Sequence, residues 1–408
     1  MNLLLIMSLR NLLVLPVVLL LVNCSSSENN EISDNTNTAA EVSIPEHLQD
    51  LENLSVFADF DPAWSVEFEQ EHSFGEIYPA LLAPQLFLGP DVAVDNEGNV
   101  YRAEKAQRKI LVFDDEGNLI QQIGRDGRGP GEFQTITAVD IHENELSVFD
   151  GTLLRISVFN TQNFELIESI PIDPNTWANK VEATHYSPRA MMALTNGMYL
   201  TAVLEEKGDG SKYSGYYLMD NKAQIVSGKI TETLNKKRHT GKAKDGHSVG
   251  IQLTFSRQGK VAVAPSGKVY HINTGEFLIK AYNETGNVEN AIYYPFEKDG
   301  LEEQEVLDEY HPNMHPALDN AEFPNSWPAL ESLIIDDENR IWVSAIVDDK
   351  NIRQWHILEE SGELRAVFPW SRDSEILTIR KGKLYAEETD PETQAKVVVS
   401  YDIRYSSI

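Results

Sequence analysis

Residues 91–133 read DVAVDNEGNVYRAEKAQRKILVFDDEGNLIQQIGRDGRGPGEF and contain four short segments with the composition of β-strands. Two of the intervening turns read DNEG and DDEG, and their glycines can adopt the positive φ that tight turns need. Short strands joined by such turns form an antiparallel meander. A four-stranded meander of about 40 residues is the unit of a β-propeller blade. The predicted strands are Asp91–Val94, Asn99–Glu104, Lys109–Phe113 and Asn118–Ile123.

The pattern of this first blade returns in the residues that follow it. Val139-Asp140 repeats Val94-Asp95 after 45 residues, and RISVF at 155–159 repeats KILVF at 109–113 after 46 residues. Two separate segments agree on one period, so the chain is predicted to contain repeated blades.

Later segments continue the pattern more loosely. A third blade is expected over residues 190–230 and a fifth over residues 331–368. The sixth shows only three strands, and the alternating segment Trp64–Glu69 is predicted to complete it beside Lys396–Ile403, because an open blade would expose a sheet edge. The fold class is therefore an all-β, six-bladed propeller of four-stranded antiparallel blades, the last closed by an N-terminal strand. The strands expected for the fourth blade are Ile251–Phe255, Lys260–Ala264, Lys268–Ile272 and Phe277–Tyr282.

An insertion at about residues 296–328 separates the fourth and fifth blades. Its segment LEEQEVLDEY, residues 301–310, has helix-forming composition, and prolines follow it. The insertion carries aromatic and histidine side chains suited to stacking on a sugar or peptide, and the same side chains could instead pack the insertion onto the propeller. These residues are Tyr310, His311, His315, Phe323 and Trp327.

Composition narrows the classes of partner. The 408-residue chain has a formal net charge of −30, which repels phosphate backbones, so we expect no nucleic-acid partner. Its one cysteine, Cys24, allows no intrachain disulfide.

The N-terminus has the layout of an export signal. Arg10 precedes an apolar run from Leu12 to Val22 that is short for a membrane span, and Cys24 follows it. Leu21-Val22-Asn23-Cys24 resembles a bacterial lipobox, which implies that the cysteine is lipidated, although Val22 and Asn23 depart from the small residues usual before that cysteine. We expect residues 1–23 to be a signal peptide, residues 24–55 to be a lipidated cysteine with a disordered tether, and residues 56–408 to form the propeller. An ordinary cleaved signal or a membrane anchor, with Cys24 incidental, is the alternative. The expected location is the cell envelope, lipid-anchored, on the periplasmic or outer-membrane face.

The first two blades resemble NHL-type repeats of six-bladed propellers. The resemblance is carried by Val92–Asp95, Gly98–Tyr101, Arg108–Phe113 and the glycine-rich connector Gly124–Phe133. The chain departs from that pattern at Ala103-Glu104, where the family tends to have Ala-Asp. As a whole the chain resembles the TolB-like propeller lipoproteins common in Bacteroidetes-type bacteria. The resemblance implies a fold and a compartment more than an activity.

Other candidate site residues are basic. Arg125 and Arg128 of the first connector could reach a carboxylate or sugar acid, or could pair with acidic residues of the neighbouring blade. The segment NKKRHTGKAKDGH, with His239 and His247, could capture an anion or be a solvated hairpin tip. His311 and His315 are four residues apart, but the prolines that follow them disfavour a helical metal pair. No matching set of acidic residues across the blades predicts a metal site, and no motif indicates a cofactor.

Two functions of different classes remain. The first is a non-catalytic binding or scaffolding propeller, with a glycan, peptide or protein as ligand and its site at a channel mouth. Its candidate binding residues are Trp327, Tyr310, His311, His315, Arg125 and Arg128. The alternative is a metal-dependent, lactonase- or lyase-type hydrolase, which needs several carboxylate, asparagine or histidine ligands converging on the channel axis.

Overall fold

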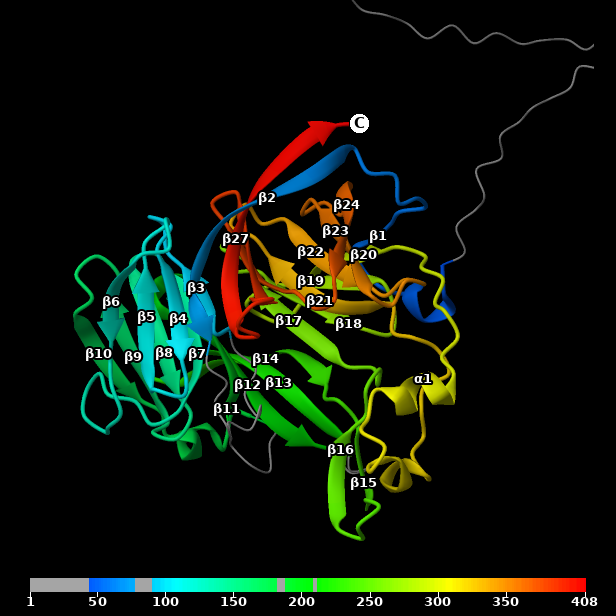
Figure 1. Cartoon of the computed structure of the whole chain (residues 1–408), viewed down its shortest axis with the longest axis horizontal. Helices are drawn as coiled ribbons and strands as arrows, with labels where there is room; N and C mark the ends of the chain where they lie inside the picture. The colour runs from blue at the N-terminus through cyan, green and yellow to red at the C-terminus, as the bar shows by residue number, and fades with distance from the viewer. Residues whose placement is uncertain (1–43, 78–89, 182–187, 208–210) are drawn as a thin grey trace, which may run out of the picture. The chain divides into compact units, whose positions relative to one another are not determined.

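A computed structural model describes residues 44–77, 90–181, 188–207 and 211–408. It confirms an all-β fold built from four-stranded antiparallel blades (Figure 1). Blades one to three have the predicted order, with each strand paired to the next along the chain. Their strands are β3 (Val92–Val94), β4 (Val100–Glu104), β5 (Lys109–Phe113) and β6 (Leu119–Ile123); β7 (Ile136–His142), β8 (Glu145–Asp150), β9 (Arg155–Asn160) and β10 (Leu166–Pro171); and β11 (Pro188–Ala193), β12 (Tyr199–Glu206), β13 (Lys212–Met219) and β14 (Ile225–Leu234).

The predicted closure of the sixth blade is confirmed. This blade consists of β25 (Glu375–Arg380), β26 (Lys383–Thr389) and β27 (Lys396–Ser407), and β2 (Trp64–Ile77) pairs antiparallel with β27 along its whole length. Lys383 and Glu71 form an ion pair across this blade. One further bridge joins β2 to the outermost strand of blade five, so the two blades form a continuous eight-stranded sheet. Blade five consists of β21 (Leu330–Ile335), β22 (Ile341–Ala345), β23 (Ile352–Leu358) and β24 (Leu364–Ser371).

The fourth blade differs from the prediction by one strand. It starts at β17 rather than at Ile251–Phe255, and it ends with β20, a strand absent from the prediction. Residues 251 and 252 instead belong to a separate hairpin of β15 (Arg238–Lys242) and β16 (Ser248–Gln252). The blade consists of β17 (Gly259–Val263), β18 (Val269–Asn273), β19 (Leu278–Tyr282) and β20 (Val288–Tyr293).

The expected insertion follows β20. It contains the helix α1 (Glu303–Asp308), which the composition of residues 301–310 predicted, and the 3-10 helix η4 (His315–Leu318). The hairpin β15–β16 packs against η4, and Ile251 and Leu253 share an apolar cluster with Ala317 and Leu318. The hairpin and the insertion, which both lie between β14 and β21, therefore pack against each other.

Part of the predicted tether lies on the propeller. The 3-10 helix η1 (Glu46–Leu48) is followed by β1 (Leu54–Val56), which pairs parallel with β20. Leu48 is buried against Leu278 and Tyr293 of blade four. Apolar residues at Leu48, Leu54 and Val56 give this segment enough surface to bury, unlike the polar residues 25–41.

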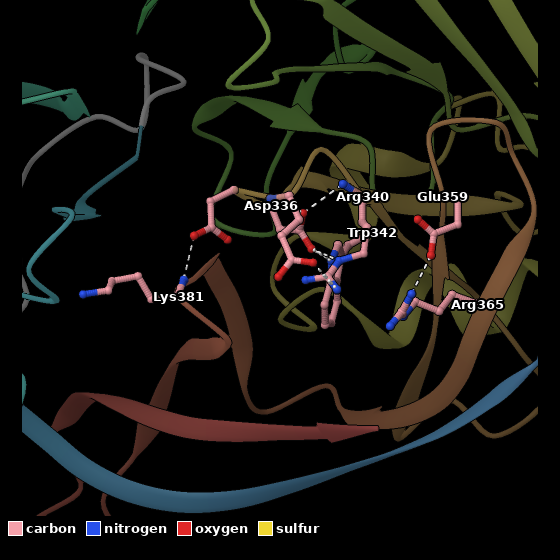
Figure 2. A network of polar contacts seen from close by, with 8 residues as sticks. Asp336, Arg340, Trp342, Glu359, Arg365 and Lys381 are labelled. Atoms are coloured by element: carbon pink, nitrogen blue, oxygen red, sulfur yellow. Dashed lines mark hydrogen bonds and ion pairs between the residues drawn. The ribbon is translucent and has the colours of Figure 1, made fainter. Parts of the chain in front are cut away.

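The inner turn of two blades, blade one and blade five, is held by an aspartate. Asp336 accepts hydrogen bonds from the backbone N–H of Glu338 and of Arg340, and from the indole Nε1 of Trp342 at 2.9 Å (Figure 2). In blade one Asp95 accepts from the hydroxyl of Tyr101 at 3.1 Å in the same way. The aspartate thus fixes the turn and accepts a hydrogen bond from the buried aromatic side chain of the second strand.

The innermost strands follow one another around an axis. β3 contacts β7, β7 contacts β11, β17 contacts β21, β21 contacts β25, and β25 returns to β3. Between blades three and four, contact runs through β14 on to β17 and β18. Because each blade is a four-stranded meander, every link from an outer strand to the next inner strand lies at the same end of the axis. We call this end the connector face and the opposite end the turn face.

Candidate functional site

The innermost strands of all six blades line a central channel with a volume of about 1190 Å³. Small-molecule sites in proteins usually occupy about 300–1,000 Å³, so the channel is large enough to hold a ligand. At the connector face the cavity extends over residues of the second and third strands of blade three. These additional lining residues are Leu204, Lys212, Ser214 and Tyr216.

Besides Lys105, which is paired with Asp91, four cations line the channel near the connector face. Lys212 begins β13, Lys236 precedes the hairpin, Arg238 begins β15, and Lys260 lies near the start of β17. Within the described ranges 44–77, 90–181, 188–207 and 211–408, none of the four forms an ion pair, although the chain has 64 acidic residues. We call these four residues the cationic patch.

The environment of Lys260 shows that two members of the patch are close enough to interact. Burial lowers the pKa of Lys260, and the positive charge of Lys236 lowers it further, while Glu331 and Glu375 act in the opposite direction. Glu331 is already bound by Arg353 at 3.0 Å and by Arg372 at 2.6 Å. The two arginines therefore compensate most of the negative charge of Glu331, which leaves little of it to stabilise the charged form of Lys260.

Several carboxylates that line the channel already form an ion pair or a hydrogen bond with other groups of the protein. Asp91 pairs with Lys105 at 2.5 Å, and Asp337 accepts from the backbone N–H of Lys381 at 2.8 Å. Asp140 accepts from the backbone N–H of Ala193 at 2.7 Å, and burial raises its pKa to about 6. These acids hold turns and neighbouring blades together, whereas the cationic patch has no such partner among the described residues.

Uncommitted amide groups accompany the patch. The side chains of Gln252 and Gln258 line the channel and make no hydrogen bond within the part of the chain that the structure describes. Asn235 accepts from the hydroxyl of Ser214 at 2.9 Å through its oxygen, which leaves its NH₂ group as a donor. The connector-face end of the channel therefore offers cationic and neutral hydrogen-bond donors together.

No group of three or more histidine, cysteine, aspartate or glutamate side chains in the described ranges is arranged to hold a metal ion. In those same ranges, every helix is too short or too polar to cross a bilayer. Cys24, the predicted lipidation site, lies outside the described residues.

The predicted residues of the insertion lie away from the channel lining. Trp327 is only 5% exposed; its ring is 4.2 Å from that of Phe255, and the Lys350 ammonium lies 4.5 Å from it. The hydroxyl of Tyr310 accepts from the backbone N–H of Thr254 at 2.7 Å. Both aromatic side chains thus pack the insertion onto the connector between β16 and β17, as the alternative interpretation expected.

The two histidines of the insertion are placed differently from each other. The Nε2 atom of His315 lies 3.1 Å from the backbone oxygen of Tyr310, which anchors η4 to the end of α1. His311 is exposed, and its Nδ1 accepts from the backbone N–H of Asn313. The structure does not bring the two imidazoles to a common ligand.

Arg125 and Arg128 are exposed on the connector between blades one and two, apart from the channel lining. Arg125 pairs with Glu132 at 2.7 Å, and Glu132 also accepts from the backbone N–H of Gly129. The partner of Arg125 thus belongs to the same connector rather than to the neighbouring blade. The carbonyl of Arg128 accepts from Arg155 of blade two. These contacts hold the connector in place between blades one and two.

The basic segment 235–247 divides between the channel and the surface. Lys236 and Arg238 line the channel, whereas Lys237 points to Glu322 of the insertion at 2.8 Å. His247 pairs with Asp245 near the exposed end of the hairpin. The positive charge of this segment is visible in the sequence, but Lys212 and Lys260 carry no local signal because neighbouring blades bring them to the patch.

Comparison with known proteins agrees with the architecture. A family model described as 6-bladed beta-propeller (DUF5128) matches residues 93–313. None of the curated proteins matches the sequence.

The chain is also similar, at low sequence identity, to several solved structures. A protein of Bacteroides fragilis NCTC 9343 described as a candidate exported protein is 11% identical, with a TM-score of 0.42 over 87% of this chain and 100% of that one. A DUF4221 family member from Bacteroides vulgatus is 12% identical, with a TM-score of 0.43 over 84% and 99%. The PQQ-bound aldose sugar dehydrogenase of Streptomyces coelicolor is 9% identical, with a TM-score of 0.42 over 84% and 99%. Because the family model covers more than half of its residues, the chain belongs to this family of six-bladed β-propellers.

Proposed function

We propose that this protein is an envelope-anchored, non-catalytic binding propeller whose ligand enters the central channel from the connector face. The observation that carries the proposal is the channel itself, a cavity of about 1190 Å³ bordered by all six innermost strands. Its lining mixes aliphatic, amide and charged side chains, which suits a ligand with several polar groups.

The position of the insertions supports entry at the connector face. Both the hairpin β15–β16 and the segment with α1 lie between an outer strand and the next inner strand, and Arg238 and Gln252 of the hairpin line the channel. Long excursions at one end of a rigid scaffold commonly carry binding function.

Envelope anchoring rests on the sequence. The apolar run Leu12–Val22 followed by Cys24 supports export and lipid attachment, and the polar residues 25–41 support a tether. The test is metabolic labelling with a fatty acid, with Cys24→Ala as the matched control. Label in the parent protein, absent from Cys24→Ala together with release from membranes, is the expected result; an unlabelled parent protein would refute the anchor.

A hydrolase is separated from a binding protein by direct assay. The purified full-length protein is incubated with a panel of lactones and esters, with and without a chelator. We expect no hydrolysis above the uncatalysed rate in either condition. Chelator-sensitive hydrolysis would overturn the binding function in favour of a metal-dependent, lactonase-type enzyme.

A further inference from the structure

The cationic patch stands out against the charge of the whole protein. Acidic residues outnumber lysine and arginine 64 to 34, yet Lys212, Lys236, Arg238 and Lys260 have no ion-pair partner in the described part of the chain. Three elements distant in sequence supply them: β13, the β14–β15 link with the first residue of the hairpin, and β17. Lys236 and Lys260 repel each other, with Glu331 and Glu375 acting in the opposite direction, and a bound anion would relieve that repulsion.

Resting on the proposed function of the channel, we propose that the cationic patch binds the carboxylates of an acidic oligosaccharide. The charged groups would pair with uronic-acid carboxylates, and Arg238 can donate two parallel hydrogen bonds to one carboxylate. The amides of Gln252, Gln258 and Asn235 would donate to or accept from the sugar hydroxyls. Cations beside neutral amide groups match a ligand that carries both carboxylates and many hydroxyl groups, as an acidic sugar does.

The geometry also provides a matched internal control. Lys237 lies between two members of the patch in sequence but binds Glu322 on the surface, with its side chain 53% exposed. Lys237→Gln removes the same charge from the same segment without touching the channel. Any difference between Lys237→Gln and Lys236→Gln therefore reports on position rather than on net charge.

The experiment is isothermal titration of the full-length protein with three probes: trigalacturonic acid, its methyl ester and triglutamate. The ester keeps the sugar skeleton and removes the charge, and triglutamate keeps the charge and removes the sugar. We expect trigalacturonic acid to bind at least about tenfold more tightly than either of the others, and its affinity to fall with added salt.

Variants complete the test. Lys236→Gln combined with Arg238→Gln should weaken trigalacturonic acid binding by at least about tenfold, because hydrogen bonds to charged groups are lost. Lys237→Gln should change it less than about twofold. Lys212→Gln, at an exposed position, serves as a second patch variant should the double variant fail to melt cooperatively.

The outcomes separate this inference from the function on which it rests. Equal binding of acid and ester would overturn the anionic specificity and leave the binding propeller intact. Preference for triglutamate, or no binding of any probe, would overturn the acidic-sugar assignment. Chelator-sensitive hydrolysis would remove the proposed function together with this inference.

Discussion

Trp64 lies opposite Ser407 in the antiparallel pair of β2 and β27, so the first long strand of the propeller is hydrogen-bonded to the last strand of the chain. The pairing continues to Ile77 opposite Lys396. Since β25 also contacts β3, the sixth blade joins the two ends of the ring. Closure by the termini couples the stability of all blades to this one seam.

Truncation tests the seam. We expect deletion up to Gln70 to lower the melting temperature by at least about 5 °C relative to deletion up to Asp61, because it removes half of β2. Deletion up to Asp61 removes η1 and β1 but leaves β2 whole, and deletion up to Glu41 is the reference. Calorimetry of the three proteins is the measurement; equal melting temperatures for the Asp61 and Gln70 truncations would show that β2 does not close the ring.

A matched pair of tyrosines tests the role of the turn aspartate. The hydroxyl of Tyr101 lies 3.1 Å from Asp95 and 3.1 Å from the backbone oxygen of Thr161, so it has hydrogen-bond partners. Blade four has Ala264 at the turn that corresponds to Asp95, and the buried hydroxyl of Tyr270 has no hydrogen-bond partner in the described chain. Tyr101→Phe should lower the free energy of unfolding by about 1–2 kcal/mol, and Tyr270→Phe by less than about 0.5 kcal/mol. Denaturant titration measures both, and equal losses would contradict this account of the turn.

Acid sensitivity is expected from a buried histidine. Burial between Phe60 and Phe277 lowers the pKa of His356 to about 4, below the ordinary value of 6.5. As the pH falls, the imidazole of His356 is therefore protonated in the unfolded chain before it is protonated in the folded chain. The stability that neutral His356 contributes is complete above about pH 6.5 and is lost as the pH falls towards 4. The loss should reach about 3 kcal/mol.

The comparison protein for this prediction is His356→Leu, whose free energy of unfolding should depend less on pH between 6.5 and 4. Asp140 acts in the opposite direction, because its raised pKa lets the folded state hold a proton up to about pH 6. Its contribution is present in both proteins and cancels in the difference. Parallel pH profiles for the two proteins would refute the assignment to His356.

Trp327 is expected to act through packing. Trp327→Ala should lower the free energy of unfolding by about 3–5 kcal/mol, because it empties the cluster formed with Phe255, Leu301 and Val306. The exposed His311→Ala is the control and should leave stability unchanged. A Trp327→Ala protein with the parent melting temperature and no ligand capture would instead support a binding role for this residue.

The blade pattern was predictable where turns and strands repeat locally. Val94-Asp95 and Val139-Asp140 located two blades, and the unpaired alternating segment Trp64–Glu69 identified the closing strand. The fourth blade was misplaced by one strand because the predicted second strand, Lys260–Ala264, covers the first strand β17, whereas Tyr270 lies on the true second strand β18. Comparing AVDNEGNVY at 93–101 with VAPSGKVY at 263–270 would have aligned Tyr270 with Tyr101.

The site was less predictable than the fold. The aromatic residues of the insertion suit a binding role by type, but sequence composition does not distinguish a stacking platform from a packed cluster such as that of Trp327 and Phe255. Lys260 lies on an ordinary-looking strand, and only the arrangement of the blades brings it near Lys236. A patch assembled from separate blades has no spacing that a linear sequence displays.

The most direct test of the central claim, that a ligand occupies the channel at the cationic patch, is lysine footprinting of the full-length protein by acetylation and mass spectrometry. With trigalacturonic acid present, Lys212 and Lys236 should be acetylated more slowly than without it, while Lys237, bound to Glu322 outside the channel, should react at an unchanged rate. Equal protection of Lys236 and Lys237, or no protection of either, would contradict the account.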